Sequence, residues 1–311
     1  MAEHVAGLAA EQPAEQGIVE TTGLRKSYDG LEALRGLDLE VPRGSISGFL
    51  GRNGAGKTTT LKVLLGMTHP SAGQARVFGL DATSPRESVD IRRRTGFVSE
   101  EKELYDYMTV EDMIRFTAAF FPRWRRDLEG RYLRSFGLPP GRKIKALSRG
   151  TRTKLALLLA FCRAGELLIL DEPTSGLDPA SAEEVLQAII ELVAGQEMTV
   201  LFSSHQIAEV EQIADRVIII DQGRSVVAGV LDDLRERFCR VRLVFAGDAP
   251  QVTFHSPGVE RATRDGRVLT ILSSRGAESV VSEAEALHPV TVDLFPVTLK
   301  EIFLESASSE D

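Results

Sequence analysis

Short apolar runs alternate with amphipathic stretches from residue 18 to about residue 235. In the amphipathic stretches, apolar residues recur at helical spacing, as Val185, Ile189 and Val193 do, which predicts helices with one buried face. The apolar runs predict strands, and the clearest are residues 45–50, 168–170, 199–202 and 216–220. This alternation predicts an α/β domain over residues 18–235, with a mixed, mostly parallel sheet covered by helices.

Local signals place several element ends within this domain. Pro42 and Gly44 interrupt residues 41–45, which predicts a turn between two strands. A helix over residues 57–65 is expected directly after a glycine-rich loop. Thr109 with Asp112 forms a capping box before a helix at 113–120, and Asp178 before a proline predicts another N-cap. Residues from about 84 to 160 are expected to form a mainly helical subdomain.

The pattern changes near residue 240, and a small C-terminal α+β domain is expected over residues 236–311. Strands are predicted at 241–245, 252–255, 268–272 and 290–294, with helices at 277–287 and 299–305. This part contains no ligand cluster, and its lone His255 is better explained as a structural or surface residue. Residues 1–17 are rich in Ala, Glu and Gln and are expected to be a disordered tail.

Composition fits a soluble globular protein with room for one large and one small domain. The 311 residues are 43% hydrophobic and 26% charged. No apolar run approaches the roughly 20 residues that cross a bilayer, and the N-terminus lacks the features of a signal peptide. Cys162 and Cys239 show no metal-ligand spacing, which predicts a reduced cytosolic protein without a zinc site.

Charge is unevenly distributed along the chain. The net charge of −8 argues against general binding of nucleic acid. Residues 86–154 nevertheless hold 17 basic and 10 acidic residues. A basic segment in an acidic protein suggests one face turned toward an anionic surface, while an arginine-rich solvated helical surface is the simpler explanation.

Residues 51–58 fit the phosphate-binding pattern G-x-x-x-x-G-K-[ST] after a predicted strand. Glycines leave the backbone N–H groups free to face phosphate, and the helix that follows adds its positive N-terminal end. Lys57 would contact the β- and γ-phosphates, and the Thr58 hydroxyl would ligate Mg²⁺. The expected nucleotide-binding residues here are Gly51, Asn53, Gly54, Ala55, Gly56, Lys57, Thr58 and Thr59.

Two acids follow the apolar run 168–170, and they form a second motif that complements the phosphate loop. Asp171 ends the predicted strand, where its carboxylate would reach Mg²⁺ through water. Glu172 lies one residue further, where it would polarise an attacking water as general base. Together with the phosphate loop, these acids predict a protein that binds a nucleoside triphosphate with Mg²⁺ and cleaves it.

Three further segments occur in a fixed order: Leu147-Ser148-Arg149-Gly150-Thr151, Pro173-Thr174-Ser175-Gly176-Leu177-Asp178, and Ser203-Ser204-His205. With the two motifs above, residues 18–235 resemble the ATP-binding cassette (ABC) ATPases. The family signature is Leu-Ser-Gly-Gly-Gln, and here Arg149 and Thr151 replace its first glycine and its glutamine. Ser148 and Gly150 keep the pattern at a predicted helix N-terminus.

The resemblance implies ATP and Mg²⁺ as cofactors and a head-to-tail dimer of cassettes with two ATP molecules between them. The second cassette would be another copy of this chain or a paralogue. Ser148 and Gly150 of one copy would complete the γ-phosphate site of the other, with Asp178 at the interface. His205 would contact the γ-phosphate and orient the attacking water, as a catalytic residue beside Glu172. Tyr28 would stack on adenine.

One position departs from the family pattern. The family usually carries a glutamine after the strand that ends at residue 98, where this chain has Glu100. The resemblance implies that Glu100 contacts the nucleotide and ligates Mg²⁺ in its place. A carboxylate would bind the metal more strongly through its charge.

The resemblance also implies a transport function at the cytoplasmic face of the cell membrane, through a separately encoded transmembrane permease. The family's permease-binding groove corresponds to residues 104–108 here. A single cassette with a short C-terminal appendage is similar to bacterial drug, antibiotic or lipid exporters. The alternative is a soluble ABC ATPase that acts on nucleic acid or ribosomes, and a P-loop GTPase is disfavoured because no Asn-Lys-x-Asp motif occurs.

Overall fold

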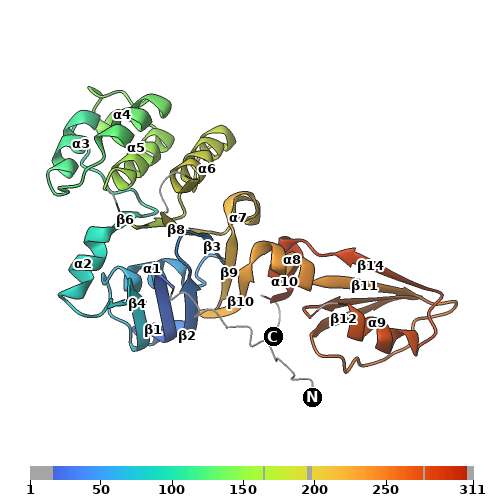
Figure 1. Ribbon diagram of the computed structural model, residues 1–311. Helices are drawn as coiled ribbons and strands as arrows, with labels where there is room; N and C mark the ends of the chain where they lie inside the picture. Colours follow the sequence, from blue (N-terminus) through green and yellow to red (C-terminus); the bar gives the residue numbers. More distant parts are fainter. Residues whose placement is uncertain (1–16, 164, 195–197, 276, 307–311) are drawn as a thin grey trace, which may run out of the picture.

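The fold is that of a computed structural model, and the structure describes residues 17–163, 165–194, 198–275 and 277–306. Two sheets and a helical bundle form one part of the molecule, and a third sheet extends from it (Figure 1). The predicted N-terminal tail lies outside these residues except for Gly17, which lies two residues before the first strand. Within the described ranges, no helix combines the length and apolar character that a bilayer span requires.

The first sheet is antiparallel and has the strand order β2-β1-β4-β5. Its strands are β1 (Val19–Tyr28), β2 (Leu31–Val41), β4 (Ala72–Val77) and β5 (Leu80–Asp81). Helix α1 (Lys57–Leu64) lies between this sheet and the central one, since it contacts both β4 and β7. The buried residues of this layer form one core, in which Leu24, Leu61 and Ile169 are fully buried.

The central sheet has the order β10-β9-β3-β8-β7-β6, and all its pairs are parallel except β10 with β9. Its strands are β3 (Ile46–Leu50), β6 (Thr95–Val98), β7 (Leu167–Asp171), β8 (Thr199–Ser204), β9 (Arg216–Asp221) and β10 (Arg224–Val230). Strands β3, β7 and β8 are buried along their whole length. Both faces are covered, which explains why buried and exposed positions do not alternate along these strands.

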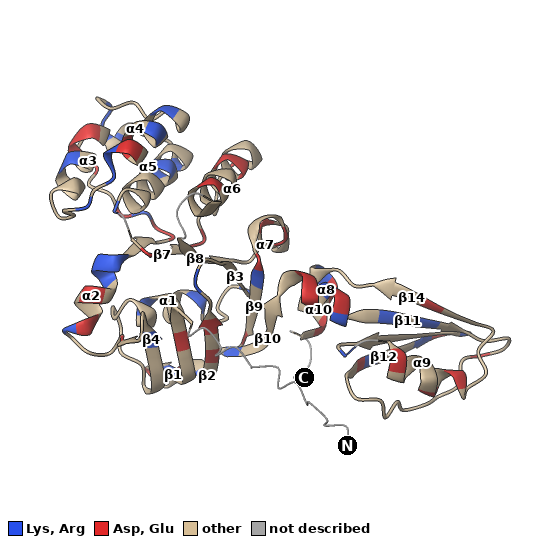
Figure 2. Cartoon of the chain, viewed as in Figure 1, with Lys and Arg blue, Asp and Glu red and all other residues tan. Residues whose placement is uncertain are grey.

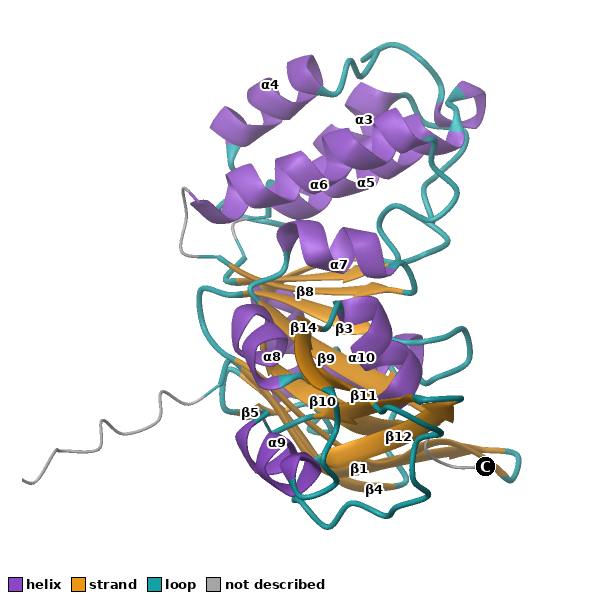
Figure 3. Ribbon diagram, turned by 90° about the vertical axis from the view of Figure 1, so that its right-hand side faces the viewer, coloured by secondary structure: helices purple, strands orange, loops and turns teal. Residues whose placement is uncertain are grey.

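Most of the helices lie on the other face of the central sheet. They are α3 (Val110–Ala118), α4 (Arg126–Ser135), a 3₁₀ turn (Ile144–Ala146), α5 (Arg149–Phe161), α6 (Pro179–Ala194) and α7 (Ile207–Ile213). Helix α2 (Glu87–Arg94) instead contacts β5 and β6, and its Ile91 is buried in the same core as α1. Figure 3 shows α3 to α6 grouped at one end, with α7 between them and the strands. The predicted caps are confirmed: Thr109 and Asp112 form a capping box, and the Ser181 amide donates to Asp178 (3.0 Å).

The C-terminal part follows helix α8 (Leu231–Arg237) and forms an antiparallel sheet in the order β12-β13-β11-β14. Its elements are β11 (Cys239–Val244), β12 (Val259–Asp265), β13 (Val268–Ser273), α9 (Glu278–Glu285), β14 (Thr291–Pro296) and α10 (Leu299–Ser306). Val241, Ile271 and Val280 are buried in a separate small core. The last helix differs, because Leu299 and Ile302 of α10 are buried in the core of the cassette.

One predicted strand is wrong. Residues 252–255 form no strand, because the amides of His255 and Ser256 donate to the Glu283 carboxylate (both 2.8 Å) rather than to a neighbouring strand. The strand of this region is β12, which pairs with β13. Its residues are almost all exposed, so it lacks the apolar alternation by which half-buried strands are recognised.

The basic segment 86–154 is not a uniform basic surface. Figure 2 shows acidic positions among the basic ones on α2, α3 and α4. Many of its arginines form ion pairs with carboxylates nearby: Arg93 with Asp90, Arg115 with Asp112, Arg125 with Asp127, Arg126 with Glu129, Arg131 with Glu191, and Arg152 with Asp106. These contacts favour the simpler explanation of the charge, a solvated helical surface.

Candidate nucleotide-binding and hydrolysis site

The phosphate loop connects the end of β3 to the start of α1. Gly54 and Gly56 have φ values of 84° and 109°, in the region that favours glycine. A Cβ at Gly56 would lie 2.8 Å from the Ala33 carbonyl oxygen, so no larger residue fits there. At Gly54 a Cβ would meet open space, and this glycine lines a cleft.

The N-terminus of α1 presents free backbone donors at this loop. Gly56 is the N-cap residue and makes no side-chain capping bond to the helix. Lys57, Thr58 and Thr59 form the first turn and line the same cleft. An uncapped first turn leaves N–H groups and a partial positive charge, which favours an anion.

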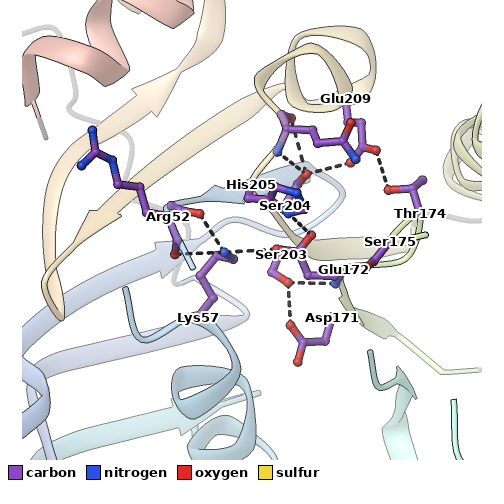
Figure 4. Close-up of polar contacts among 12 residues, drawn as sticks. Arg52, Lys57, Asp171, Glu172, Thr174, Ser175, Ser203, Ser204, His205 and Glu209 are labelled. Atoms are coloured by element: carbon purple, nitrogen blue, oxygen red, sulfur yellow. Dashed lines mark hydrogen bonds and ion pairs between the residues drawn. The ribbon is translucent and has the colours of Figure 1, made fainter. Parts of the chain in front are cut away.

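Lys57 extends from this turn into the site, where its side chain is buried (Figure 4). Its Nζ donates to the carbonyl oxygens of Gly51 (2.7 Å) and Arg52 (3.3 Å). The same Nζ lies 3.1 Å from Oε1 of Glu172. The loop therefore holds its cation between backbone carbonyls and a buried carboxylate.

Asp171 and Glu172 reach the site from the end of β7, beside β8. The parallel register pairs Asp171 with Ser203. The Ser203 hydroxyl donates to Oδ1 of Asp171 (2.7 Å) and accepts from the Glu172 amide (3.0 Å). One buried serine thus orients both acids.

The Glu172 carboxylate lies between a lysine and a histidine. Its Oε2 lies 2.8 Å from Nδ1 of His205, which is 41% exposed at its side chain. Its Oε1 is buried and forms an ion pair with Lys57. No described residue donates a hydrogen bond to this oxygen. A buried carboxylate oxygen with a free lone pair is suited to accept a proton from water.

Lys102 holds the backbone of the same glutamate. Its Nζ donates to the carbonyl oxygen of Glu172 (3.0 Å) from a largely buried position. Burial, followed by repulsion from Arg149, lowers the pKa of Lys102 to about 8, and the nearby Glu100, Asp171 and Glu172 act in the opposite direction.

Glu209 of α7 supports the loops around the two catalytic candidates. Its buried carboxylate accepts from the Thr174 hydroxyl (2.5 Å) and from the Ser204 hydroxyl (2.7 Å). Thr174 lies two residues after Glu172, and Ser204 directly precedes His205. This carboxylate therefore fixes the segment after β7 to the segment after β8.

These side chains border a cleft of about 530 Å³. The cleft is lined by Ala33, Arg52, Asn53, Gly54, Gly56, Lys57, Thr58, Thr59, Glu100, Glu172, Ser175 and His205. Nine of the sequence-predicted site residues are in this set, among them Glu100 in the place expected for the family glutamine. The set does not include Gly51, Ala55 or Asp171, which are buried.

Tyr28 is not among the lining residues of the cleft. It ends β1 with 43% of its surface exposed, and the Nζ of Lys26 lies 4.7 Å from the centre of its ring. The predicted stacking on adenine would therefore use a ring outside the lining of the cleft.

The signature residues lie away from the cleft of their own chain. Ser148 caps α5 by accepting from the Thr151 amide (3.2 Å), and Gly150 lies in the first turn. Asp178 caps α6, where hydrogen bonds from the Ser181 hydroxyl and amide lower its pKa. Neither Ser148, Gly150 nor Asp178 lines the cleft.

Arg149, which departs from the family signature, lies against the loop that follows the two acids. Its Nη2 donates to the Ser175 hydroxyl (3.4 Å). A Cβ at Gly176, whose φ is 69°, would lie 2.3 Å from the Arg149 guanidinium carbon. The arginine therefore packs on a glycine and next to Ser175, which lines the cleft.

The residues present fit a magnesium nucleotide. The open cradle at Gly54, the buried Lys57 and the uncapped α1 suit phosphate. Thr58, Glu100 and Asp171 offer the oxygen ligands that Mg²⁺ prefers. Among the described residues, no group of three or more His, Cys, Asp or Glu side chains could hold a metal alone. A metal here would share phosphate oxygens, as Mg²⁺ commonly does.

Sequence reasoning missed several of these contacts. Ser203 and Ser204 were identified only as part of a motif with His205, although the pairing of adjacent parallel strands would place Ser203 beside Asp171. Lys102 carried no recognisable signal, because its contact with Glu172 joins residues 70 positions apart. Arg52 and Ser175 lie within motifs whose other members were selected.

Comparisons with known proteins agree with this geometry. The family profile described as "ABC transporter" matches residues 34–175, and one described as "AAA domain, putative AbiEii toxin, Type IV TA system" matches residues 140–211. The Nod factor export ATP-binding protein I of Ralstonia nicotianae is 32% identical over 322 residues, covering 96% of this chain and 98% of that protein.

Two further similarities cover the cassette. The bacitracin transport ATP-binding protein BcrA of Bacillus licheniformis is 35% identical, over 71% of this chain and 72% of that protein. A solved structure described as "Structure of ATP binding subunit of ABC transporter" has a TM-score of 0.63 at 30% identity, over 70% of this chain and 92% of that one. The chain therefore belongs to the ABC transporter family, as an ATP-binding subunit with ATPase activity coupled to transport.

Proposed function

We propose that this chain hydrolyses ATP in the described cleft to drive export of a substrate through a separate transmembrane permease. The observation that carries this proposal is the placement of Glu172, whose buried carboxylate lies between Lys57 and His205 beside the phosphate loop. In this role Glu172 takes a proton from the attacking water, and His205 contacts the γ-phosphate. Export is favoured by the similarity to a Nod factor export subunit along nearly the whole chain.

Mg²⁺ is the proposed metal, held by Thr58, Glu100 and, through water, Asp171. When bound, it neutralises charge that builds up on the transferred phosphoryl group. Glu100 would replace the neutral family glutamine with a charge. We expect Glu100→Ala to raise the Mg²⁺ concentration needed for half-maximal hydrolysis, and an unchanged Mg²⁺ requirement would contradict the assignment.

The active form is proposed to be a dimer of cassettes. Ser148, Gly150 and Asp178 lie outside their own cleft, at the exposed starts of α5 and α6, so they are available to a partner. A helix N-terminus with Ser148 at its cap suits a γ-phosphate presented by the other cassette. Tyr28, at the exposed end of β1, does not line the cleft. It is proposed to stack on the adenine of ATP from there.

The proposed permease contact is a groove and aromatic patch beside the loop after β6. The groove encloses about 180 Å³ and includes Leu104, Met113 and Ala156 in its lining. Tyr105 and Tyr107 are exposed next to it, with ring centres 5.8 Å apart. An amphipathic helix of the permease would bury this apolar surface.

Through the permease, the chain would lie at the cytoplasmic face of the membrane. The basic segment 86–154 is proposed to face anionic lipid there, even though many of its arginines are paired. Co-sedimentation with vesicles of neutral lipid, with and without anionic lipid, tests this. Binding that lacks a salt-sensitive preference for the anionic vesicles would contradict it.

Glu172→Gln tests the central proposal. It removes the proton acceptor but keeps the shape, so hydrolysis should fall by about 100-fold or more. ATP binding should persist, and ATP-bound dimers should accumulate in size-exclusion chromatography. The exposed Glu236→Gln is the matched control and should leave turnover unchanged.

The dimer is tested in the same background. Adding Ser148→Glu to Glu172→Gln should abolish the ATP-bound dimer, because a negative charge would face the partner's γ-phosphate. Retention of hydrolysis in Glu172→Gln would overturn the role of the glutamate. Retention of the dimer with Ser148→Glu would overturn the arrangement of the two cassettes.

A further inference from the structure

Lys102 occupies an unusual position for a lysine. It lies in the loop after β6 with φ of 47°, a backbone region in which non-glycine residues are uncommon. Only 8% of its surface is exposed, whereas lysines are almost never fully buried unless they have a partner. Such a position is costly, which suggests that the side chain has a specific task.

The partner is the backbone of Glu172. The Lys102 Nζ donates to the Glu172 carbonyl oxygen at 3.0 Å. Charged groups near the ammonium are Arg149 from the start of α5, Glu100 from the same loop, and the two acids at the end of β7. Among the described residues no carboxylate oxygen forms an ion pair with this ammonium, and it donates to the Glu172 carbonyl.

Glu172 itself needs this support. Its φ is 48°, so its backbone is also in the left-handed region. Its amide is held by the Ser203 hydroxyl (3.0 Å) and its carbonyl by Lys102, on the two sides of the same Cα. The direction of the carboxylate toward His205 follows from this fixed backbone.

We propose that Lys102 is a positioning residue for ATP hydrolysis, which fixes the backbone of Glu172 so that its carboxylate faces the cleft. This inference rests on the proposed role of Glu172 as the proton acceptor. Lys102 does not line the nucleotide cleft and so would not contribute to ATP affinity. Its removal should therefore act on turnover and not on binding.

The first experiment compares Lys102→Met with the wild type in the full-length chain. We expect kcat for ATP hydrolysis to fall by about 10- to 100-fold, the loss expected when a reacting group is displaced by about 1 Å. The Kd of ATP should change by less than about twofold, since its binding groups are untouched. Lys102→Arg, which keeps a donor, should recover part of the activity. The exposed Lys300→Met is the matched control and should behave as the wild type.

A cycle with Glu172→Gln separates positioning from a general structural role. Single-turnover hydrolysis is measured for each single variant and for the double variant. If Lys102 acts through Glu172, Lys102→Met should have less than about a twofold effect once the carboxylate is gone. A loss of equal size in both backgrounds would overturn the proposal, as would a kcat for Lys102→Met within about twofold of the wild type.

The outcomes also separate this inference from the proposed function. If Glu172→Gln leaves hydrolysis intact, the role of Glu172 fails. If Glu172→Gln stops hydrolysis but Lys102→Met does not slow it, only the positioning role fails. If Lys102→Met does not fold, Lys102→Gln replaces it in the same cycle, because glutamine keeps a polar group but has a shorter side chain. A loss of equal size in both backgrounds, or a kcat within about twofold of the wild type, would again overturn the positioning role.

Discussion

Ser203 links the two acids of the site through a single hydroxyl. It is fully buried, donates to Asp171 and accepts from the Glu172 amide. Neither contact can be replaced by solvent at this depth. A buried hydrogen-bonding group that loses its partner costs more than the bond itself contributed.

Ser203→Ala should therefore destabilise the protein by about 1–3 kcal/mol in urea unfolding, because it leaves the Asp171 carboxylate and the Glu172 amide unpaired. It should also slow hydrolysis, since the Glu172 backbone loses one of its two supports. Ser135→Ala, at the exposed end of α4, is the control and should change stability by less than about 0.5 kcal/mol. Equal effects of the two variants would contradict this assignment.

The two cysteines should differ in reactivity. Burial raises the pKa of the Cys162 thiol to about 12, and its side chain is fully buried. A raised thiol pKa means that almost no thiolate is present at pH 8, where iodoacetamide reacts with the thiolate. Cys239 is half-buried, and burial raises its pKa as well, but it remains partly accessible.

We expect Cys162 to stay unmodified by iodoacetamide at pH 8 in the folded protein and to react after unfolding in guanidinium. Mass spectrometry of the peptides measures both sites, with Cys239 as the internal reference. Modification of Cys162 at the rate of Cys239 in the folded protein would show that the helix around it opens readily.

Individual site residues were predictable from the sequence where they belong to a short motif. Lys57, Glu172 and His205 fall in short patterns with a chemical reason for each position, and they meet at the cleft. Their supports were not predictable. Lys102, Ser203 and Glu209 make contacts between distant segments, and only the folded register brings those segments together.

At the scale of elements, the start of α5 packs against the loop between β7 and α6. Arg149 lies on Gly176, and the close approach leaves no space for a Cβ. The glycine also has φ of 69°, a conformation that costs about 1–2 kcal/mol for other residues. The backbone conformation penalises any substitution of Gly176, whereas the guanidinium is the far end of a flexible side chain and can shift away.

Gly176→Ala should destabilise the chain by about 1–2 kcal/mol, and this cost should come from its backbone because the guanidinium of Arg149 can move aside. In an Arg149→Gly background the contact is gone, so nearly the same cost should remain. Urea unfolding of the four proteins of this cycle measures the difference. A clearly smaller cost in the Arg149→Gly background would show that the guanidinium is held in place.

The positions of the elements agree closely with the sequence pattern where their side chains are buried. Strands β3, β7, β8 and β9 and the caps of α3 and α6 lie where their residues predict. The C-terminal strand β12 was missed and residues 252–255 were wrongly predicted as a strand. Periodicity reports burial, and β12 is held by pairing with β13 while its side chains stay exposed.

At the scale of the whole molecule, the C-terminal part is attached to the cassette in two ways. Its sheet has a core of its own, which includes Val280, while α10 returns to the cassette and buries Ile302 there. The C-terminal domain was predicted to begin at residue 236. Its last helix, α10, nevertheless packs on the cassette that precedes this boundary. The single tryptophan, Trp124, packs against the same cassette core.

Ile302→Ala should destabilise the cassette by about 2–5 kcal/mol, the cost of removing a buried isoleucine side chain. The loss should appear as an earlier urea transition in Trp124 fluorescence. Val280→Ala removes a buried residue from the C-terminal core and should leave that transition nearly unchanged. An equal shift from both variants would mean that the two cores unfold as one unit.

The hairpin between β9 and β10 has a consequence for how the protein is made. The Gly223 amide donates to the Ala55 carbonyl of the phosphate loop (3.0 Å), and its own carbonyl accepts from the Arg35 amide (2.9 Å). Residue 223 leaves the ribosome long after residue 55, by roughly 8–34 s at ordinary rates of translation. For that time the nascent loop lacks one of the bonds that shape it, so we expect a growing chain that ends before residue 223 to bind ATP more weakly than the full-length chain.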